Sequence, residues 1–370
     1  MKIEQITLYQ FEQPLVHPFR TSFGEKTTRP CIMVAVQSEG LTGWGECVAH
    51  PRPDYSYETL TTAWHVLEEF LVPPLIGHQV TAAADIFATA GYKMVRGHNM
   101  AKAALENAVW DLLARAQNVP LQQLLGGDKE RIEVGVSIGI QPTLSGLLDR
   151  VDSFVAAGYG RIKVKIEPGW ELEPLRGIRE RQPDIKLMAD ANSAFRIKDA
   201  ALFNDMADLN LLMIEQPLAE DDIIDHAELQ AQVSTPICLD ESIHTLHDVR
   251  VAIALNACRI INIKVGRVGG LTTALAIHDL CAEAGIPVWC GGMLETGVGR
   301  AANLHLASLP NFTLPSDLSA SNRYYHEDIA EPAFSLNPED STIAVPTGPG
   351  IGVAVQMDRL NKVLQRQVVI

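Results

Sequence analysis

The stretch RIKVKIEPGW, residues 161–170, has the pattern of a β-strand, because apolar residues alternate with charged ones until a Pro-Gly pair ends the run. Side chains two apart on a strand point to the same face, so Lys163 and Lys165 share a face. Two neighbouring ammonium groups indicate either an antiparallel sheet with one face in water or a strand whose end lines a site. The rest of the chain decides between them.

Beyond residue 130, short apolar runs recur, and helical patterns lie between most of them. The eight runs are 134–140, 161–166, 185–190, 211–217, 235–242, 259–264, 286–292 and 311–317. A strand and a helix repeated eight times are typical of a (β/α)8-type barrel. A doubly wound parallel sheet is the alternative, but it does not require eight evenly spaced units.

The chain before these runs has a different pattern. The first 60 residues contain alternating stretches that predict strands, and residues from about 57 to 117 carry apolar side chains at helical spacing. Strands followed by helices indicate a separate α+β domain. Gly126 and Gly127 end the last helical pattern, so we expect the domain boundary there.

Composition excludes several classes of protein. The 370 residues are 47% apolar and 20% charged, and a chain of this length suits one large barrel or two domains. The net charge of −15 argues against a nucleic-acid partner, because such proteins need clustered Lys and Arg. No apolar run reaches the roughly 18 residues of a membrane span, and the N-terminus does not resemble a signal peptide.

The cysteines and histidines do not form a recognisable metal motif. The six cysteines are scattered without a C-x-x-C pair, and the 11 histidines include no H-E-x-x-H. We therefore expect buried, reduced thiols in a cytoplasmic protein, with neither a nucleic-acid nor a membrane partner.

Charged residues stand at the ends of five successive apolar runs. These residues are Lys165, Asp190, Glu215, Asp240 and Lys264, spaced 24 or 25 positions apart. The C-terminal ends of barrel strands meet at one mouth, so their side chains are expected to lie together. Three crowded carboxylates require a cation, and oxygen ligands suit Mg²⁺ or Mn²⁺. One such acid could equally be a helix N-cap, but three at a fixed spacing favour a metal site.

The lysines lie on both sides of these acids along the chain, so across a barrel they would face each other over the metal. A lysine close to another cation in a partly dry site loses its proton more readily and can act as a base. Lys163 is beside Lys165, and Arg267 follows Lys264 closely. This pattern predicts removal of an acidified C–H proton next to a metal-bound carboxylate, with the metal stabilising the enediolate.

With the motifs KVK, DAN, IEQP and DES and a lysine on the sixth strand, the sequence resembles the enolase superfamily, in its muconate-cycloisomerase-like subgroup. Longer stretches, such as PFRTSFGE, RIKVKIEPGW and NIKVGRVGG, resemble the branch that contains o-succinylbenzoate synthases and N-acylamino-acid racemases. The resemblance covers essentially the whole chain. It implies a modified TIM barrel, (β/α)7β, over residues 128–319, an α+β capping domain over 1–127, and a C-terminal segment, 320–370, that packs back on the cap.

The resemblance also implies roles for individual residues. Asp190, Glu215 and Asp240 are expected to bind Mg²⁺, with Mn²⁺ or another divalent ion as a substitute. Lys165 would be the base, and Lys264 would stabilise the enediolate or act as the second acid/base on the opposite face. Lys163 would tune Lys165 by lowering its pKa. The residues expected to bind substrate or tune the site are Asn192, Arg267, Ser137, Gly291, Gly292, Met293, Arg20 and Ser22. The loops 19–25 and 50–58 would close over the mouth and exclude water.

The implied activity is that of a hydro-lyase acting on a small carboxylate, 2-succinyl-6-hydroxy-2,4-cyclohexadiene-1-carboxylate, in menaquinone biosynthesis. Racemisation of N-succinyl or other N-acyl amino acids is expected beside it, and the protein is expected to form a homo-oligomer. The alternatives are a protein that is primarily a racemase, another lyase or epimerase of the subgroup, and a non-catalytic binding barrel. A metal-dependent hydrolase would require His ligands, which the strand ends lack. Ser316 and Asn322 depart from the pattern of the branch, and LPSDLSA lacks the Asp-x-Asp of dipeptide epimerases.

Overall fold

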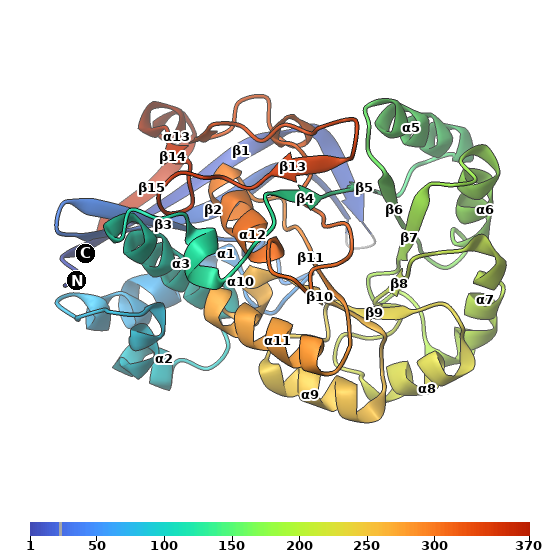
Figure 1. Cartoon of the computed structure of the whole chain (residues 1–370), viewed down its shortest axis with the longest axis horizontal. Helices are drawn as coiled ribbons and strands as arrows, with labels where there is room; N and C mark the ends of the chain where they lie inside the picture. The colour runs from blue at the N-terminus through green and yellow to red at the C-terminus, as the bar shows by residue number, and fades with distance from the viewer. Residues whose placement is uncertain (22–23) are drawn as a thin grey trace.

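The computed structural model describes residues 1–21 and 24–370 (Figure 1). An antiparallel sheet with its helices occupies one side of the molecule, and a curled parallel sheet surrounded by helices occupies the other. Both chain ends lie on the side of the antiparallel sheet. No helix of the described residues is both long enough and apolar enough to span a membrane.

The antiparallel sheet has the strand order β15-β1-β2-β3. Its strands are β1 (Gln5–Thr21), β2 (Gly24–Ser38), β3 (Leu41–Cys47) and the C-terminal β15 (Leu364–Val369). Helix α3 (Asn99–Ala116) packs closely on β3, because a Cβ at Gly43 would lie 2.1 Å from the carbonyl oxygen of Ala108. A Cβ at Gly45 would lie 2.0 Å from that of Ala104, so both positions require glycine.

The predicted helical region between the sheet and the barrel is confirmed, but it is divided into several short elements. Pro73 and Pro74 cannot donate backbone hydrogen bonds, and the first helical segment ends there. Besides α3, the elements of this region are α1 (Leu60–Val66), the π-helix η1 (Leu67–Leu71), the 3₁₀ helices η2 (Pro73–Leu75) and η3 (Ala83–Ala88), α2 (Ala90–Met94) and α4 (Leu121–Leu125).

Seven parallel strands form the second sheet, in chain order from β5 to β11. They are β5 (Val136–Ile138), β6 (Arg161–Lys165), β7 (Lys186–Asp190), β8 (Ile214–Glu215), β9 (Ile237–Leu239), β10 (Ile260–Ile263) and β11 (Val288–Cys290). Each lies within one of the first seven predicted runs. The doubly wound alternative is wrong, because these strands follow one another around the sheet without a reversal of order.

The eighth predicted run, 311–317, closes the barrel without forming a regular strand. Phe312 makes a parallel bridge to Val288 of β11, and Ser316 makes one to Val134, just before β5. The run contains Pro315, which has no backbone N–H for a continuous ladder. We call residues 311–317 the closing segment. The modified (β/α)7β barrel is thus confirmed, with a closing segment in the eighth position.

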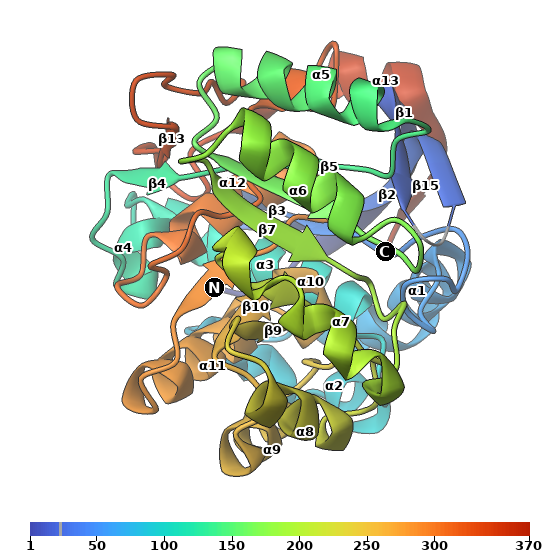
Figure 2. The same cartoon turned by 90° about the vertical axis from the view of Figure 1, so that its right-hand side faces the viewer.

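Helices surround the barrel on its outer face, as Figure 2 shows for α5 to α9. Side chains of Thr143 and Thr245 accept hydrogen bonds from backbone N–H groups and so cap the first turns of α5 and α9. The helical elements are α5 (Leu144–Ala156), α6 (Leu172–Arg181), η4 (Ile197–Asp199), α7 (Ala200–Asn204), η5 (Ala207–Leu209), α8 (Ile224–Gln232), α9 (Leu246–Leu255), α10 (Val265–Val268), α11 (Leu271–Glu283) and α12 (Gly297–Ala307).

The environment of β6 decides whether its two lysines face water or line a site. All five residues of this strand are buried, and the strand pairs in parallel with β5 and β7, so an antiparallel sheet with one face in water is wrong. Ile162, Val164 and Ile166 belong to the main hydrophobic core, together with side chains of the surrounding helices. Lys163 and Lys165 therefore point toward the barrel interior.

The chain returns to the first sheet after the barrel. The elements after the barrel are η6 (Ser321–Arg323), β12 (Ala330–Glu331), β13 (Thr342–Ala344), β14 (Ala354–Val355) and α13 (Met357–Val363), while β4 (Arg131–Glu133) precedes β5. β13 pairs with β4, and β15 pairs with β1, so the C-terminal segment reaches both parts of the molecule. We propose that the domain boundaries lie at 127/128 and 319/320. All six cysteines are free and buried, as expected.

Candidate active site

Charged side chains from successive strands meet at the C-terminal end of the barrel. The register pairs Lys165 with Asp190 and Asp190 with Glu215, so these three residues form one row across β6, β7 and β8. Asp240 directly follows β9, and Lys264 directly follows β10. The regular spacing in the sequence therefore corresponds to one ring of side chains at the barrel mouth.

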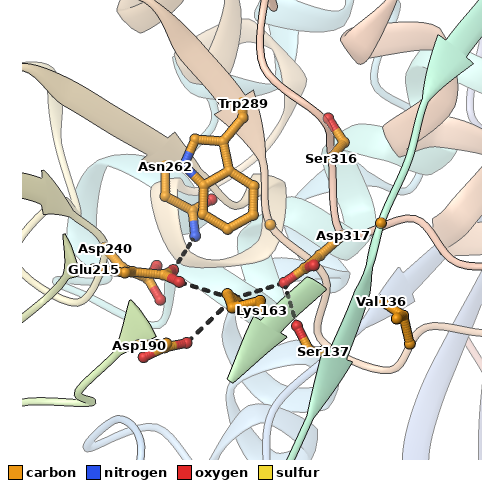
Figure 3. Close-up of polar contacts among 12 residues, drawn as sticks. Val136, Ser137, Lys163, Asp190, Glu215, Asp240, Asn262, Trp289, Ser316 and Asp317 are labelled. Carbon is orange, nitrogen blue, oxygen red and sulfur yellow. Dashed lines mark hydrogen bonds and ion pairs between the residues drawn. The ribbon is translucent and has the colours of Figure 1, made fainter. Parts of the chain in front are cut away.

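Lys163 lies among three carboxylates (Figure 3). Its Nζ lies 2.8 Å from Oε2 of Glu215, 3.1 Å from Oδ2 of Asp190 and 2.6 Å from Oδ2 of Asp317. Burial favours the neutral amine, but Asp317, Glu215 and Asp190 together outweigh it and raise the pKa of Lys163 above its ordinary value. The ring of Trp289 lies below the same ammonium group, with its centroid 4.8 Å away.

Among the three acids that contact Lys163, Glu215 and Asp190 are affected differently by their surroundings. Burial and the charge of Asp190 raise the pKa of Glu215. Burial also disfavours the charged form of Asp190, but Lys165 and Lys163 outweigh this effect and hold its pKa below its ordinary value. Asn262 donates a hydrogen bond of 2.7 Å to Oε1 of Glu215 and thereby orients that carboxylate.

Lys165 shares Asp190 with Lys163. Its Nζ lies 2.6 Å from Oδ2 of Asp190 and 2.6 Å from Oδ1 of Asn192. The amide of Asn192 donates in turn to Oε1 of Glu241 at 2.7 Å. Asn192 therefore fixes the position of the Lys165 ammonium group, and the predicted effect of Lys163 on the pKa of Lys165 stays a prediction.

Lys264 is held from both the barrel and the cap. Its Nζ lies 2.6 Å from Oδ2 of Asp240 and 3.1 Å from Oη of Tyr55, which belongs to the loop after β3. Burial disfavours the ammonium form, but Tyr55, Glu241 and Glu215 raise the pKa of Lys264 above its ordinary value. Arg267 contacts the other oxygen of Asp240, so Lys264 and Arg267 share one carboxylate.

Asp317 is a central residue of the site that the sequence interpretation did not assign. It lies at the end of the closing segment and pairs with Arg161 at 2.6 Å as well as with Lys163. Ser137 donates a hydrogen bond of 2.9 Å to the same carboxylate. Burial raises the pKa of Asp317, but Arg161 and Lys163 outweigh it and hold the pKa below its ordinary range. The sequence signal that could have identified Asp317 is its position at the end of the eighth apolar run.

One pocket joins the barrel mouth to the cap. Its lining includes Phe19, Lys26, His50 and Tyr55 from the cap, and Ser137, Lys163, Lys165, Asn192, Lys264, Gly292, Met293, Leu294, Asp317 and Tyr324. Four of the eight residues predicted to bind substrate or tune the site are in this set, namely Ser137, Asn192, Gly292 and Met293. Tyr55, Lys26 and His50 were not predicted individually, although the loop 50–58 was expected to cover the mouth.

Two predicted residues, Gly291 and Arg20, do not line this pocket. Gly291 packs behind Lys264, because an added Cβ would lie 2.7 Å from Cε of that lysine. Arg20 is exposed, and its backbone carbonyl accepts a hydrogen bond of 3.2 Å from the N–H of Ile140. The predicted residue Ser22 lies outside the described residues.

Four residues at the barrel mouth have strained backbone conformations. Asn192, Ser193, Gln216 and Leu294 have φ angles of 42°, 63°, 39° and 60°. These are left-handed conformations that residues with a side chain adopt at a cost of order 1–3 kcal/mol, and such strain is common at functional sites. Gln216 is held by backbone N–H groups of Asp240 and Ser242, which donate to its side-chain oxygen at 2.9 and 3.2 Å.

The three predicted metal ligands are buried and close to one another, but each is paired with a cation of the protein. Within residues 1–21 and 24–370, no three His, Cys, Asp or Glu side chains lie grouped so as to hold a metal ion as they stand. The donor set nevertheless fits a hard divalent cation, because carboxylate oxygens converge from neighbouring strand ends. In addition, the buried Oε2 of Glu241 has no hydrogen-bond partner among the described residues. The assignment of Asp190, Glu215 and Asp240 as ligands stays a prediction.

Known proteins have similar sequences and the same fold. Residues 5–126 match the family described as mandelate racemase / muconate lactonizing enzyme, N-terminal domain, and residues 146–359 match the enolase C-terminal domain-like family. The chain is 51% identical to an o-succinylbenzoate synthase of Geobacillus kaustophilus, covering 99% of this chain and 96% of that protein. It is 47% identical to an N-succinylamino acid racemase of Amycolatopsis sp, covering 100% and 99%. A solved enolase superfamily structure from Listeria innocua superposes with a TM-score of 0.95 at 42% identity, covering 100% and 99%.

Proposed function

The chain belongs to the mandelate racemase / muconate lactonizing enzyme family of the enolase superfamily, and we propose that it is an o-succinylbenzoate synthase that also racemises N-succinyl amino acids. Enzymes of this family act on small molecules and use a divalent metal ion. The relatives at 43% identity or more include both activities, which supports one site with two reactions.

The position of two lysines on opposite sides of one pocket carries this proposal. Lys165 ends β6, the second strand of the barrel, and Lys264 follows β10, the sixth. In a ring of eight positions these two are diametrically opposed, and both side chains line the same pocket. A planar enediolate held between them can exchange a proton on either face.

We assign the dehydration to Lys165. In its neutral form, Lys165 removes the proton from the ring carbon that carries the carboxylate. The ring C–O bond then breaks, the hydroxide leaves with the proton that Lys165 returns, and the products are the aromatic ring and water. Lys264, as an ammonium group, stabilises the negative charge that develops on the substrate carboxylate.

Racemisation begins with the same removal of a proton next to a carboxylate, but the second step is reprotonation instead of loss of hydroxide. One lysine removes the α-proton of the N-succinyl amino acid, and the opposite lysine delivers a proton to the other face. Asn192 holds Lys165 in place, and Asp240 with Tyr55 holds Lys264. These contacts orient both lysines toward a carbon between them.

We propose that Asp190, Glu215 and Asp240 hold Mg²⁺, with Mn²⁺ or another divalent ion as a substitute. When bound, the ion supplies positive charge that acidifies the α-proton of the substrate carboxylate. Binding requires Lys163 and the catalytic lysines to give up part of their contacts with these acids. Lys163 retains Asp317 as a partner, which supports a role in positioning and charge balance.

The decisive experiment supplies purified protein and MgCl₂ with the cyclohexadiene precursor and, separately, with N-succinyl amino acids in deuterated water. We expect succinylbenzoate from the first and α-deuterium with loss of optical purity from the second. The absence of both would overturn the proposed function. The ratio of the two kcat/KM values tests the second candidate, a protein that is primarily an N-acylamino-acid racemase, which the 47% identity to such an enzyme favours.

We also propose a cytoplasmic homo-oligomer. The free, buried cysteines suit a reducing compartment. Phe70 and Met94 lie on contacting elements of the cap and are 49% and 79% exposed, so a second copy could cover them. Light scattering of the purified protein, and fractionation of cells that express it, test these two statements.

A further inference from the structure

Lys26 is a half-buried lysine of β2 that lines the same pocket as the catalytic lysines. Its Nζ lies 2.7 Å from Nδ1 and 3.2 Å from Nε2 of the His50 ring. Among the described residues, its hydrogen-bond partner is this imidazole, and no carboxylate forms an ion pair with it. Lys165 and Lys264, in contrast, each contact a carboxylate at 2.6 Å.

His50 does not neutralise this ammonium group. Burial lowers the pKa of His50 to about 3, so its ring is uncharged at neutral pH. Burial also lowers the pKa of Lys26 to about 7. The charged groups that face Lys26 are Arg29, Lys165 and Arg52, which lower its pKa further, and Asp54, which raises it. A positive charge surrounded mainly by other positive charges favours the binding of an anion.

The location of Lys26 shows which part of a ligand could reach it. Lys26 and His50 line both the catalytic pocket and a second groove formed by residues of the cap, so they form the wall between the two. At the barrel mouth, by contrast, Lys163, Lys165 and Lys264 each form an ion pair with a carboxylate. Phe19, Met293, Leu294 and Tyr324 supply apolar and aromatic surface elsewhere in the lining.

We propose that Lys26 binds the second carboxylate of a dicarboxylate substrate, at the end of its succinyl chain. The first carboxylate then lies at the barrel mouth, near the catalytic lysines. This inference rests on the proposed function and assigns a specificity residue to it. His50 accepts a hydrogen bond from the ammonium group and holds it at the pocket wall. The cap thereby recognises the end of the acyl chain, and the barrel carries out the chemistry.

A charge-assisted hydrogen bond to Lys26 forms only if the acyl chain ends in a carboxylate. A chain of the same length that ends in a carboxamide would leave the buried cation without a counter-charge, so its kcat/KM should be about 10- to 100-fold lower. We expect the difference in KM, because the end of the acyl chain carries no reacting atom and Lys26 would bind it alike in the ground state and the transition state.

The experiment compares N-succinyl-L-phenylalanine with N-succinamoyl-L-phenylalanine, which differ only in that terminal group. Racemisation of both is measured for the wild type, Lys26→Met, Lys26→Arg and Lys198→Met. Lys198 is an exposed lysine of η4, so its substitution removes the same charge elsewhere on the barrel. The preference for succinyl should disappear in Lys26→Met, persist in part in Lys26→Arg, and remain intact in Lys198→Met.

Two results would overturn the proposal for Lys26 while leaving the proposed function intact. The first is a wild-type preference that Lys26→Met retains. The second is an equal loss toward both substrates, with the variant still folded by circular dichroism. A wild type that racemises neither substrate and does not dehydrate the cyclohexadiene would instead be a failure of the proposed function itself.

Discussion

The ammonium group of Lys163 lies 2.6 Å from Oδ2 of Asp317, and this contact links β6 to the closing segment of the barrel. Ser137 of β5, which lies between them in the sheet, donates to the same carboxylate. Arg161, at the other end of β6, contacts the remaining oxygen. Asp317 therefore connects the closure of the barrel to the ion pairs of the active site.

We expect Asp317→Asn to lower the free energy of unfolding by about 3–5 kcal/mol, because it leaves the buried Arg161 guanidinium without a carboxylate. Urea unfolding measures this loss. Asp340→Asn is the matched control, since Asp340 is 48% exposed and lies 3.9 Å from the exposed Arg131. That variant should change stability by less than about 1 kcal/mol. Equal effects of the two substitutions would contradict the role of Asp317.

Lys165→Met and Lys264→Met should each abolish racemisation, because one of the two faces loses its acid/base group. Each variant should nevertheless exchange the α-proton of one enantiomer with deuterated solvent, and the two variants should prefer opposite enantiomers. Proton NMR of N-succinyl-D- and L-phenylalanine measures this exchange. If both variants exchanged the same enantiomer, the two lysines would not lie on opposite faces of the substrate.

Removal of the metal should stop both reactions, and addition of Mg²⁺ should restore them. Binding can be followed without turnover, because a ligand that binds only the folded state raises the unfolding temperature. MgCl₂ should raise the unfolding temperature of the wild type and have a much smaller effect on Asp240→Asn. An equal increase in both proteins would exclude Asp240 as a ligand.

The sequence predicts the catalytic ring well because that ring depends on local repetition. Each βα unit places one residue at a strand end, so the spacing from Lys165 to Lys264 already indicates which side chains meet. Asp317 occupies the same kind of position, but Pro315 disrupts the eighth strand, and the contact between Arg161 and the Pro315 carbonyl joins residues 154 positions apart. No local pattern encodes that pairing.

The contribution of the cap is harder to predict for the same reason. Tyr55 reaches Lys264 across 209 positions of the chain, and Lys26 enters the pocket from a strand of a different sheet. These contacts depend on how the cap docks on the barrel, and that docking involves further contacts between residues far apart in the chain, such as Glu46 with Thr296 and Glu106 with Thr272. Only the general expectation that residues 50–58 cover the mouth follows from the sequence.

Lys26→Met should stabilise the protein, and the gain should depend on pH. Because the folded-state pKa of Lys26 is lowered from 10.5 to about 7, the unfolded chain binds more protons between these values, and wild-type stability rises with pH across that window. The variant lacks this group, so its advantage should reach up to about 5 kcal/mol below pH 7 and shrink toward pH 10.

Urea unfolding at pH 6.5 and pH 9.5 measures the difference between Lys26→Met and the wild type. Lys198→Met serves again as the control, because an exposed lysine should give the same small difference at both pH values. A difference for Lys26→Met that does not decrease at pH 9.5 would contradict the burial of an unpaired ammonium group.

Gly291→Ala should reduce activity without unfolding the protein. The added methyl group would lie 2.7 Å from Cε of Lys264 and 2.4 Å from Oδ1 of Asn262. Both the Asn262 amide, which donates to Glu215, and the flexible end of Lys264 therefore have to move. A displacement of about 1 Å at an acid/base group can lower the rate by a factor of about 100, and we expect this loss in the kcat of racemisation.

The matched control is Gly177→Ala in α6, where the nearest atom to the added methyl group is a Leu144 methyl carbon at 3.1 Å. This variant should retain wild-type kcat, since α6 belongs to the outer layer of helices. Retention of full racemase activity by Gly291→Ala would show that Lys264 does not depend on the space behind it. A loss of kcat with an unchanged unfolding temperature would instead identify Gly291 as the residue that leaves room for the second acid/base group.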